Sequence, residues 1–175
     1  MHYYCIQEAY NELTKHSHEW LVDQLWNNLL YFYFSDSRFL IAVQVQPAPS
    51  SQAMMDVSLS YVQLPSIKLK TFCVIKNKSV ELEGQDAIWA EAIEQLTGHM
   101  LENRDARGQD LEDIYGIVTV GRYSRFYVLK ARSNDLEDLP GSGGDHFEFK
   151  KDEMAIDGIL RNMKADIEGR SSFSP

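Results

Sequence analysis

The fold is decided by the stretch Thr71-Phe72-Cys73-Val74-Ile75-Lys76-Asn77-Lys78. It joins an apolar run directly to a segment with two lysines. Four consecutive apolar residues, Phe72 to Ile75, are typical of a strand that is buried in the middle of a sheet. The chain from Leu69 to Ile75 is therefore predicted to be a central strand. Lys76 and Lys78 lie two residues apart, so their side chains are expected to point to the same face of the sheet.

Two further strands are predicted before this central strand. The segment Phe39 to Val45 is rich in β-branched and apolar residues, and Asp56 to Val62 alternates polar with apolar residues. The clearest helix follows, from Gln85 to Leu101, and carries a broad apolar stripe. A helix between two strands suits a crossover connection, which makes those strands parallel.

The remaining elements follow from the same periodicities. We predict two N-terminal helices, the second capped by Ser17, then a polar loop at 103–113, a hairpin of strands 115–120 and 125–129, a short strand at 146–149 and a final helix after Asp152. The fold class is therefore α/β, with a mixed central β-sheet flanked by helices and an N-terminal helical segment. Since no linker divides the chain, we expect a single domain over residues 1–170 and a flexible tail at 171–175.

Composition limits the classes of partner and the location. The formal net charge of −9 argues against tight non-specific binding to nucleic acid, because neutralising phosphates supplies most of that affinity. No apolar run reaches the roughly 18 residues of a membrane-spanning helix, and no signal peptide is recognisable. Cys5 and Cys73 do not suggest a disulfide framework. We therefore expect an intracellular protein, cytoplasmic or nuclear, with no membrane contact.

From about Glu19 to Leu129 the order of elements resembles that of the PD-(D/E)XK, or restriction-endonuclease-like, nuclease superfamily. The stretches 71–78 and 114–127 are most similar to uncharacterised members from filamentous fungi. In those members the first stretch usually reads apolar-Ile-Glu-x-Lys, and the second reads Tyr-Gly-Ile-Val-x-x-Gly-Arg followed by an aromatic residue. The resemblance implies a restriction-endonuclease-like core and a Mg²⁺-dependent site for phosphodiester cleavage.

The resemblance assigns a role to four residues of this chain. Asp56 matches the first metal-binding aspartate, and Lys78 matches the lysine that orients or polarises the attacking water. Gln95 is the candidate for the glutamine of the helix, and Glu19 is the candidate for the N-terminal acid. Each has a simpler explanation: Asp56 as a turn or edge residue, Lys78 as a solvated strand end, Gln95 as polar helix surface, and Glu19 as a partner of the helix dipole.

The chain departs from the motif at Lys76, which stands where the second carboxylate ligand is expected. A cation at this position removes an oxygen ligand and repels the metal ion. Asp56 is also preceded by Met55 rather than by proline. A displaced acid is the alternative source of a ligand, and four residues are candidates for it: Glu81, Glu83, Glu91 and Glu94.

Two other groups of residues raise binding hypotheses. Arg122 and Arg125 interleave with aromatic residues and are candidates for nucleic-acid contacts, although a hairpin with basic tips is the favoured explanation. His16 and His18 are a weak metal signal, because no third ligand lies nearby in the sequence.

The sequence is compatible with three functions. The chain is predicted to be a degenerate nuclease-like domain, with weak or no Mg²⁺-dependent phosphodiesterase activity, that acts through binding of nucleic acid or protein. The alternatives are an active Mg²⁺-dependent endonuclease with a displaced glutamate ligand, or a pure protein-interaction domain. The sequence predicts no substrate and no oligomeric state.

Overall fold

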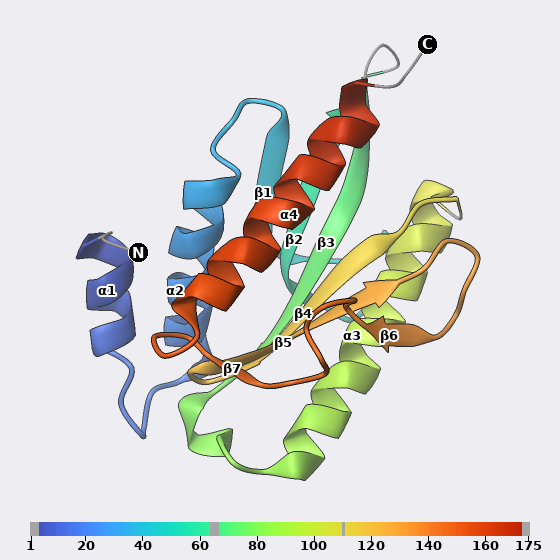
Figure 1. The fold of residues 1–175 in the computed structure, drawn as a ribbon. Coiled ribbons are helices and arrows are strands. Elements are labelled where there is room, and N and C mark those ends of the chain that lie inside the picture. Colours follow the sequence, from blue (N-terminus) through green and yellow to red (C-terminus); the bar gives the residue numbers. More distant parts are fainter. Residues whose placement is uncertain (1–3, 64–66, 110, 173–175) are drawn as a thin grey trace.

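A seven-stranded mixed sheet forms the centre of the molecule, in a computed structural model that describes residues 4–63, 67–109 and 111–172 (Figure 1). The strands run in the order β1-β2-β3-β4-β5-β6, and β7 pairs with β5. Their bounds are β1 (Phe39–Val45), β2 (Met55–Gln63), β3 (Lys68–Lys78), β4 (Ile114–Val120), β5 (Tyr123–Leu129), β6 (Leu136–Asp138) and β7 (Phe147–Glu148). The helices are α1 (Tyr4–Asn11), α2 (Glu19–Tyr33), α3 (Asp86–Arg107) and α4 (Glu153–Ser172), with the short 3-10 helix η1 (Val80–Leu82) after β3.

The sheet is mixed because one pair of strands is parallel. β3 and β4 run parallel, and α3 makes the crossover between them, whereas the other paired strands are antiparallel. The predicted α/β class, with a mixed sheet and flanking helices, is confirmed. β3 also lies between β2 and β4, as its apolar run predicted.

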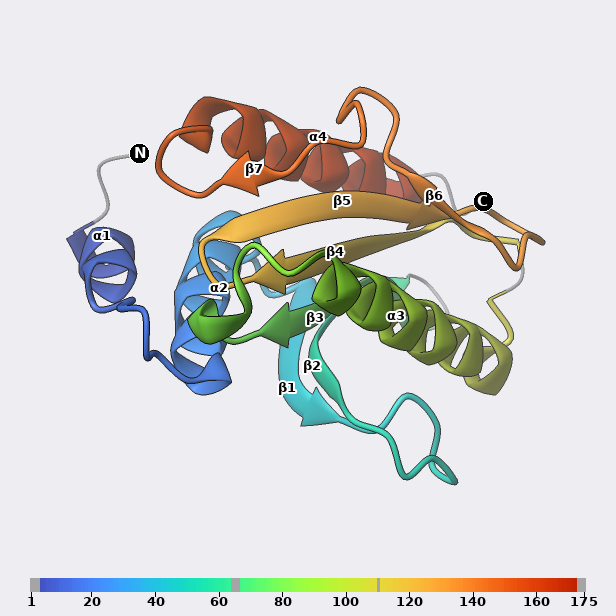
Figure 2. The same ribbon diagram turned by 90° about the horizontal axis from the view of Figure 1, so that it is seen from below.

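Helices cover both faces of the sheet, and each face has its own hydrophobic cluster. α1, α2 and α4 supply the first cluster, and α3 supplies the second; Figure 2 shows α3 and α4 on opposite sides of the strands. Neighbouring strand residues alternate between the clusters, so Ile75 faces the first and Val74 faces the second. A register shift in the β2–β3 pairing interrupts this alternation, which places both Phe72 and Cys73 in the first cluster.

The close approach of α3 to β4 depends on Gly116. A Cβ atom added there would lie 2.9 Å from Leu96 Cδ2 and 3.1 Å from the sulfur of Met100. Since van der Waals contact needs more room than this, glycine lets the helix lie directly on the strand. This packing fixes the position of α3 relative to the end of β3.

The helix α3 is longer than predicted, and the expected loop at 103–113 was wrong over its first part. The helix continues to Arg107 and ends at Gly108, which adopts a left-handed conformation with φ 60°. Polar residues at 103 and 104 suggested a loop, but both are buried. The two terminal nitrogens of Arg104 donate hydrogen bonds to the main-chain carbonyls of Leu129, Lys130 and Ser133, which ties the end of α3 to the segment after β5.

Three other features of the fold differ from the sequence prediction: the start of α2, the presence of β6 and the end of α4. Ser17 does not cap α2: His18 occupies the N-cap position, and the Ser17 hydroxyl instead accepts a hydrogen bond from the Thr14 main-chain N–H at 2.7 Å. The strand β6 was not predicted. α4 runs to Ser172, into the stretch 171–175 expected as a tail, and residues 173–175 lie outside the described part of the chain. Within the described residues, no helix is both long and apolar enough to cross a membrane.

Candidate functional site

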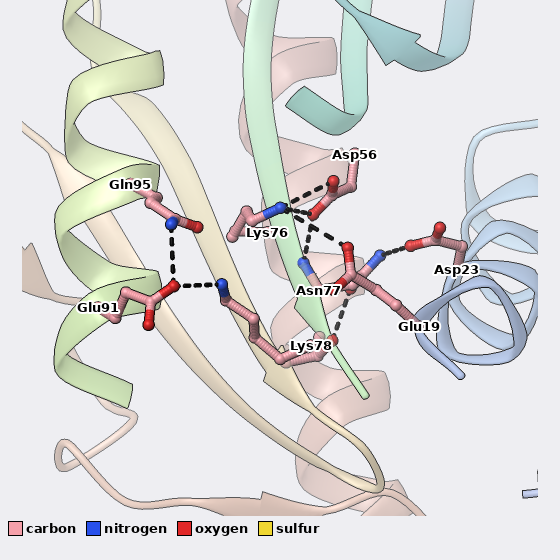
Figure 3. A network of polar contacts seen from close by, with 9 residues as sticks. Glu19, Asp23, Asp56, Lys76, Asn77, Lys78, Glu91 and Gln95 are labelled. Carbon is pink, nitrogen blue, oxygen red and sulfur yellow. Dashed lines mark hydrogen bonds and ion pairs between the residues drawn. The ribbon is translucent and has the colours of Figure 1, made fainter. Parts of the chain in front are cut away.

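Four elements bring polar side chains together beside the end of β3. The first turns of α2 contribute Glu19 and Asp23, and the start of β2 contributes Asp56. β3 contributes its last three residues, and α3 contributes Glu91 and Gln95. Figure 3 shows these side chains linked by hydrogen bonds and ion pairs, so the structure gathers Glu19, Asp56, Lys78 and Gln95 in one region.

Asp56 is buried and bonded to the main chain and to one side chain. Its exposed fraction is 4%, and its Oδ2 accepts a hydrogen bond from the Asn77 main-chain N–H at 2.7 Å. The Lys76 Nζ lies 2.9 Å from Oδ1 and 2.8 Å from Oδ2. Both carboxylate oxygens therefore bind the same ammonium group, and the negative charge of Asp56 is compensated inside the protein.

Glu19 is the second acid that faces this ammonium group. It is the first residue of α2, and its Oε1 lies 3.8 Å from the Lys76 Nζ. Burial raises the pKa of Glu19, while the Lys76 charge acts in the opposite direction. Lys76 thus lies between the two acids that the nuclease resemblance assigns to the site.

A second set of contacts, missed by the sequence analysis, lies on the other side of β3. Asn77 is fully buried, and its Nδ2 donates to Asp23 Oδ1 at 2.6 Å. The Thr119 hydroxyl donates to Asn77 Oδ1 at 2.5 Å, because Asn77 and Thr119 are register partners across the parallel pair. The spacing of Glu19 and Asp23, one helical turn apart, was the available signal.

Burial raises the pKa of Asp23 to about 6, and the hydrogen bond from Asn77 only partly opposes this effect. The negative charges of Asp56 and Glu19 add to the increase. The Asp23 carboxyl therefore holds its proton far more readily than a solvated aspartate does.

Lys78 has a different partner from Lys76. Its Nζ donates to Glu91 Oε1 at 2.8 Å, and Gln95 Nε2 donates to the same oxygen at 3.0 Å. These contacts lie on the α3 side of β3, and none of them reaches Asp56 among the contacts of the described residues. Lys78, which the resemblance assigns to the attacking water, is thus tied to α3.

The residues present do not fit a divalent metal ion at Asp56. The Lys76 ammonium already occupies both oxygens of that carboxylate, and a second cation beside it would be repelled. Among the described residues, no group of three or more histidine, cysteine, aspartate or glutamate side chains is placed to hold a metal. We therefore derive no catalytic step through Mg²⁺.

Three of the four glutamates considered as displaced ligands lie beside partners other than Asp56. Glu83 binds Arg122, and Glu91 binds Lys78. Glu81 lies 3.9 Å from the exposed His16. Glu94 is exposed on α3. Glu19 is the acid that shares the Lys76 ammonium group with Asp56.

The two arginines considered for nucleic-acid contacts are paired with carboxylates. Arg122 donates to Glu83 through its main-chain N–H at 2.7 Å, through Nε at 3.1 Å and through Nη2 at 2.8 Å. Arg125 Nη2 lies 2.9 Å from Asp138 Oδ1. These charges stabilise the β4–β5 turn and its neighbours rather than stand free at the surface.

Searches of protein-family models, curated proteins and solved structures found no match to this chain.

Proposed function

We propose that this chain is a nuclease-like domain that does not cleave, and that it acts by binding a partner protein. The single observation that carries the proposal is the position of Lys76, whose Nζ lies within 2.9 Å of both Asp56 oxygens. In the nucleases that the chain resembles, this carboxylate binds a metal ion. Here a covalently attached ammonium group supplies the positive charge instead.

The ammonium group cannot perform the chemistry of the metal. Hydrolysis of a phosphodiester with Mg²⁺ needs a Lewis acid that holds the phosphate and lowers the pKa of a bound water. The three N–H donors of a lysine coordinate no water in this way, and here they are directed at Asp56 and Glu19. The end of β3 thus carries a lysine between two acids and lacks the group that would activate water.

A protein partner is favoured over nucleic acid because the relevant cations are already neutralised. Lys76, Lys78, Arg122 and Arg125 each pair with a carboxylate. The chain as a whole carries a net charge of −9. A phosphate backbone would meet repulsion without the counterion release that drives its binding. The two free cysteines agree with an intracellular location, which remains part of the proposal.

Calorimetric titration of divalent metal ions, together with a charge-reversal variant at Lys76, tests whether Lys76 prevents the metal binding that cleavage would need. We expect no heat when Mg²⁺ or Mn²⁺ is added to the natural protein in a calorimeter. The variant Lys76→Glu places a second carboxylate beside Asp56. The Tm of this variant is expected to fall without metal, because the two carboxylates repel each other, and to recover when millimolar Mg²⁺ binds between them. The matched control is Lys78→Glu, which makes the same charge change two residues away and is expected to show no such recovery.

Two results would contradict the proposal. Heat from the natural protein that disappears in Asp56→Ala would mean that Asp56 binds metal despite Lys76, and the endonuclease alternative would be favoured. Salt-dependent retention of the natural protein on an immobilised polyanion would show that the protein has a basic surface. Nucleic acid would then be favoured over a protein as the partner.

A further inference from the structure

A pocket of about 390 Å³ is lined by residues from the segment after β3, the start of α3, the β4–β5 hairpin and the loop before β7. Its size falls in the usual range of about 300 to 1,000 Å³ for small-ligand sites. Three aromatic rings contribute to its lining: Trp89 from α3, Tyr123 from β5 and His146 from the loop before β7. Two carboxylates, Glu83 and Asp86, contribute as well.

The rings come from separate parts of the chain and meet at the pocket. The ring centroids of Trp89 and His146 lie 4.3 Å apart at an interplanar angle of 50°. Trp89 is 7% exposed and Tyr123 is 38% exposed, so one ring is fixed in the fold and the other is free to contact a ligand. Burial and the nearby Arg125 lower the pKa of His146, which keeps its imidazole neutral near pH 7.

The net charge of the pocket lining is negative once the ion pair between Glu83 and Arg122 is counted as neutral. The Glu83 carboxylate is compensated by its bonds to Arg122. Asp86 makes no ion pair within the part of the chain that the structure describes, and it lies in the first turn of α3. The N-terminal end of a helix carries roughly half a positive charge, so the full negative charge of Asp86 leaves this end of the pocket negative.

We propose that this pocket binds an alkylated ammonium group, either on a small quaternary amine or on a methylated lysine side chain. Aromatic faces attract cations through the ring quadrupole, and methyl groups spread the positive charge over a surface that packs against rings. A bare ammonium or potassium ion keeps its hydration shell and gains less from such walls. An anion is disfavoured by Asp86.

Titration of choline tests this site, with NMR signals of the indole N–H groups as the readout. Trp89 is the reporter, and Trp20 and Trp26 on α2 serve as internal references. We expect a saturable shift of the Trp89 signal with choline in the millimolar range. The neutral isostere 3,3-dimethylbutan-1-ol, which has the same shape, and potassium chloride at equal ionic strength are expected to leave that signal unchanged.

Variants at the pocket wall separate cation recognition from apolar packing. Tyr123→Ala is expected to weaken choline about tenfold, and Asp86→Asn several-fold. The matched controls are Tyr31→Ala, an exposed tyrosine on α2, and Asp105→Asn, an exposed aspartate on α3, and neither is expected to change affinity. These substitutions avoid the buried Trp89, so loss of folding does not confuse the result.

Trimethyllysine and lysine peptides distinguish the two sources of the ligand. Tighter binding of a trimethyllysine peptide than of choline would identify a protein source, and the reverse order would identify a free amine. The proposal is overturned if the neutral isostere binds as tightly as choline, if Tyr123→Ala binds choline unchanged, or if neither choline nor the peptide shifts Trp89. None of these variants alters Asp56 or Lys76, so the outcome is independent of the metal titration.

Discussion

Lys76 and Lys78 lie two residues apart on the same strand, but their ion pairs lie in very different surroundings. The side chains of Lys76 and Asp56 are 11% and 5% exposed, whereas those of Lys78 and Glu91 are 11% and 50% exposed. A buried pair loses most of its hydration, and each partner then depends on the other. A pair with one exposed partner keeps water as an alternative. Equal distances of 2.8 Å therefore do not imply equal energies.

Removing the charge of Asp56 is expected to have the largest effect. Asp56→Asn leaves the Lys76 ammonium buried with only Glu19 nearby, which we expect to cost about 3 kcal/mol in the free energy of unfolding. Urea denaturation measures the change. The double variant Asp56→Asn with Lys76→Met is the control, because it removes the uncompensated charge and should recover most of the loss. A double variant as unstable as the single one would mean that the Asp56 oxygens matter for the main chain rather than for Lys76.

The pH dependence of Asp23 is expected to give a smaller effect. Its folded pKa of about 6 lies above the value of 3.8 for an isolated aspartate, so the folded state keeps a proton that the unfolded state has released. The contribution of Asp23 to stability is therefore present below about pH 4 and is lost as pH rises to about 6. Asp23→Asn should gain stability relative to the natural protein over this interval, as measured by urea unfolding at several pH values. Parallel pH profiles of Asp23→Asn and the natural protein would contradict this expectation.

Lys78 is expected to give the smallest effect. Lys78→Met keeps the aliphatic stem and removes the charge, so it should change the free energy of unfolding by less than about 1 kcal/mol. The same urea experiment measures it, with Glu91→Gln as the matched change on the other partner. A loss as large as that of Asp56→Asn would show that the exposure of Glu91 does not decide the strength of the pair.

The periodicity of the sequence was enough to predict β1, β2, β3, the β4–β5 hairpin and the crossover through α3. These elements repeat apolar residues at fixed spacing, so the buried face can be read directly. The end of α3 was missed because Asn103 and Arg104 are polar residues that became buried through hydrogen bonds to distant segments. Local sequence does not contain those partners.

The candidate site was predictable only in part. The resemblance named Glu19, Asp56, Lys78 and Gln95, and the structure places all four near the end of β3. The bond between Lys76 and Asp56 was not predicted, because the sequence shows an altered motif without showing where the lysine side chain points. Asp23 and Asn77 were missed for a similar reason, since their contact joins a helix to a strand far along the chain.

The single parallel pairing, between β3 and β4, also sets the order in which the sheet can assemble. β1, β2 and β3 are joined by short connections, whereas β4 reaches β3 only after the chain through η1 and α3 has folded back. Closing the longer loop costs more chain entropy before any contact repays it, so we expect the antiparallel β1–β3 unit to gain its hydrogen bonds earlier in folding. Glu19, Asp56 and Lys76 all precede the crossover. The internal cation is thus carried by a part of the chain that is synthesised before α3 is available to cover it.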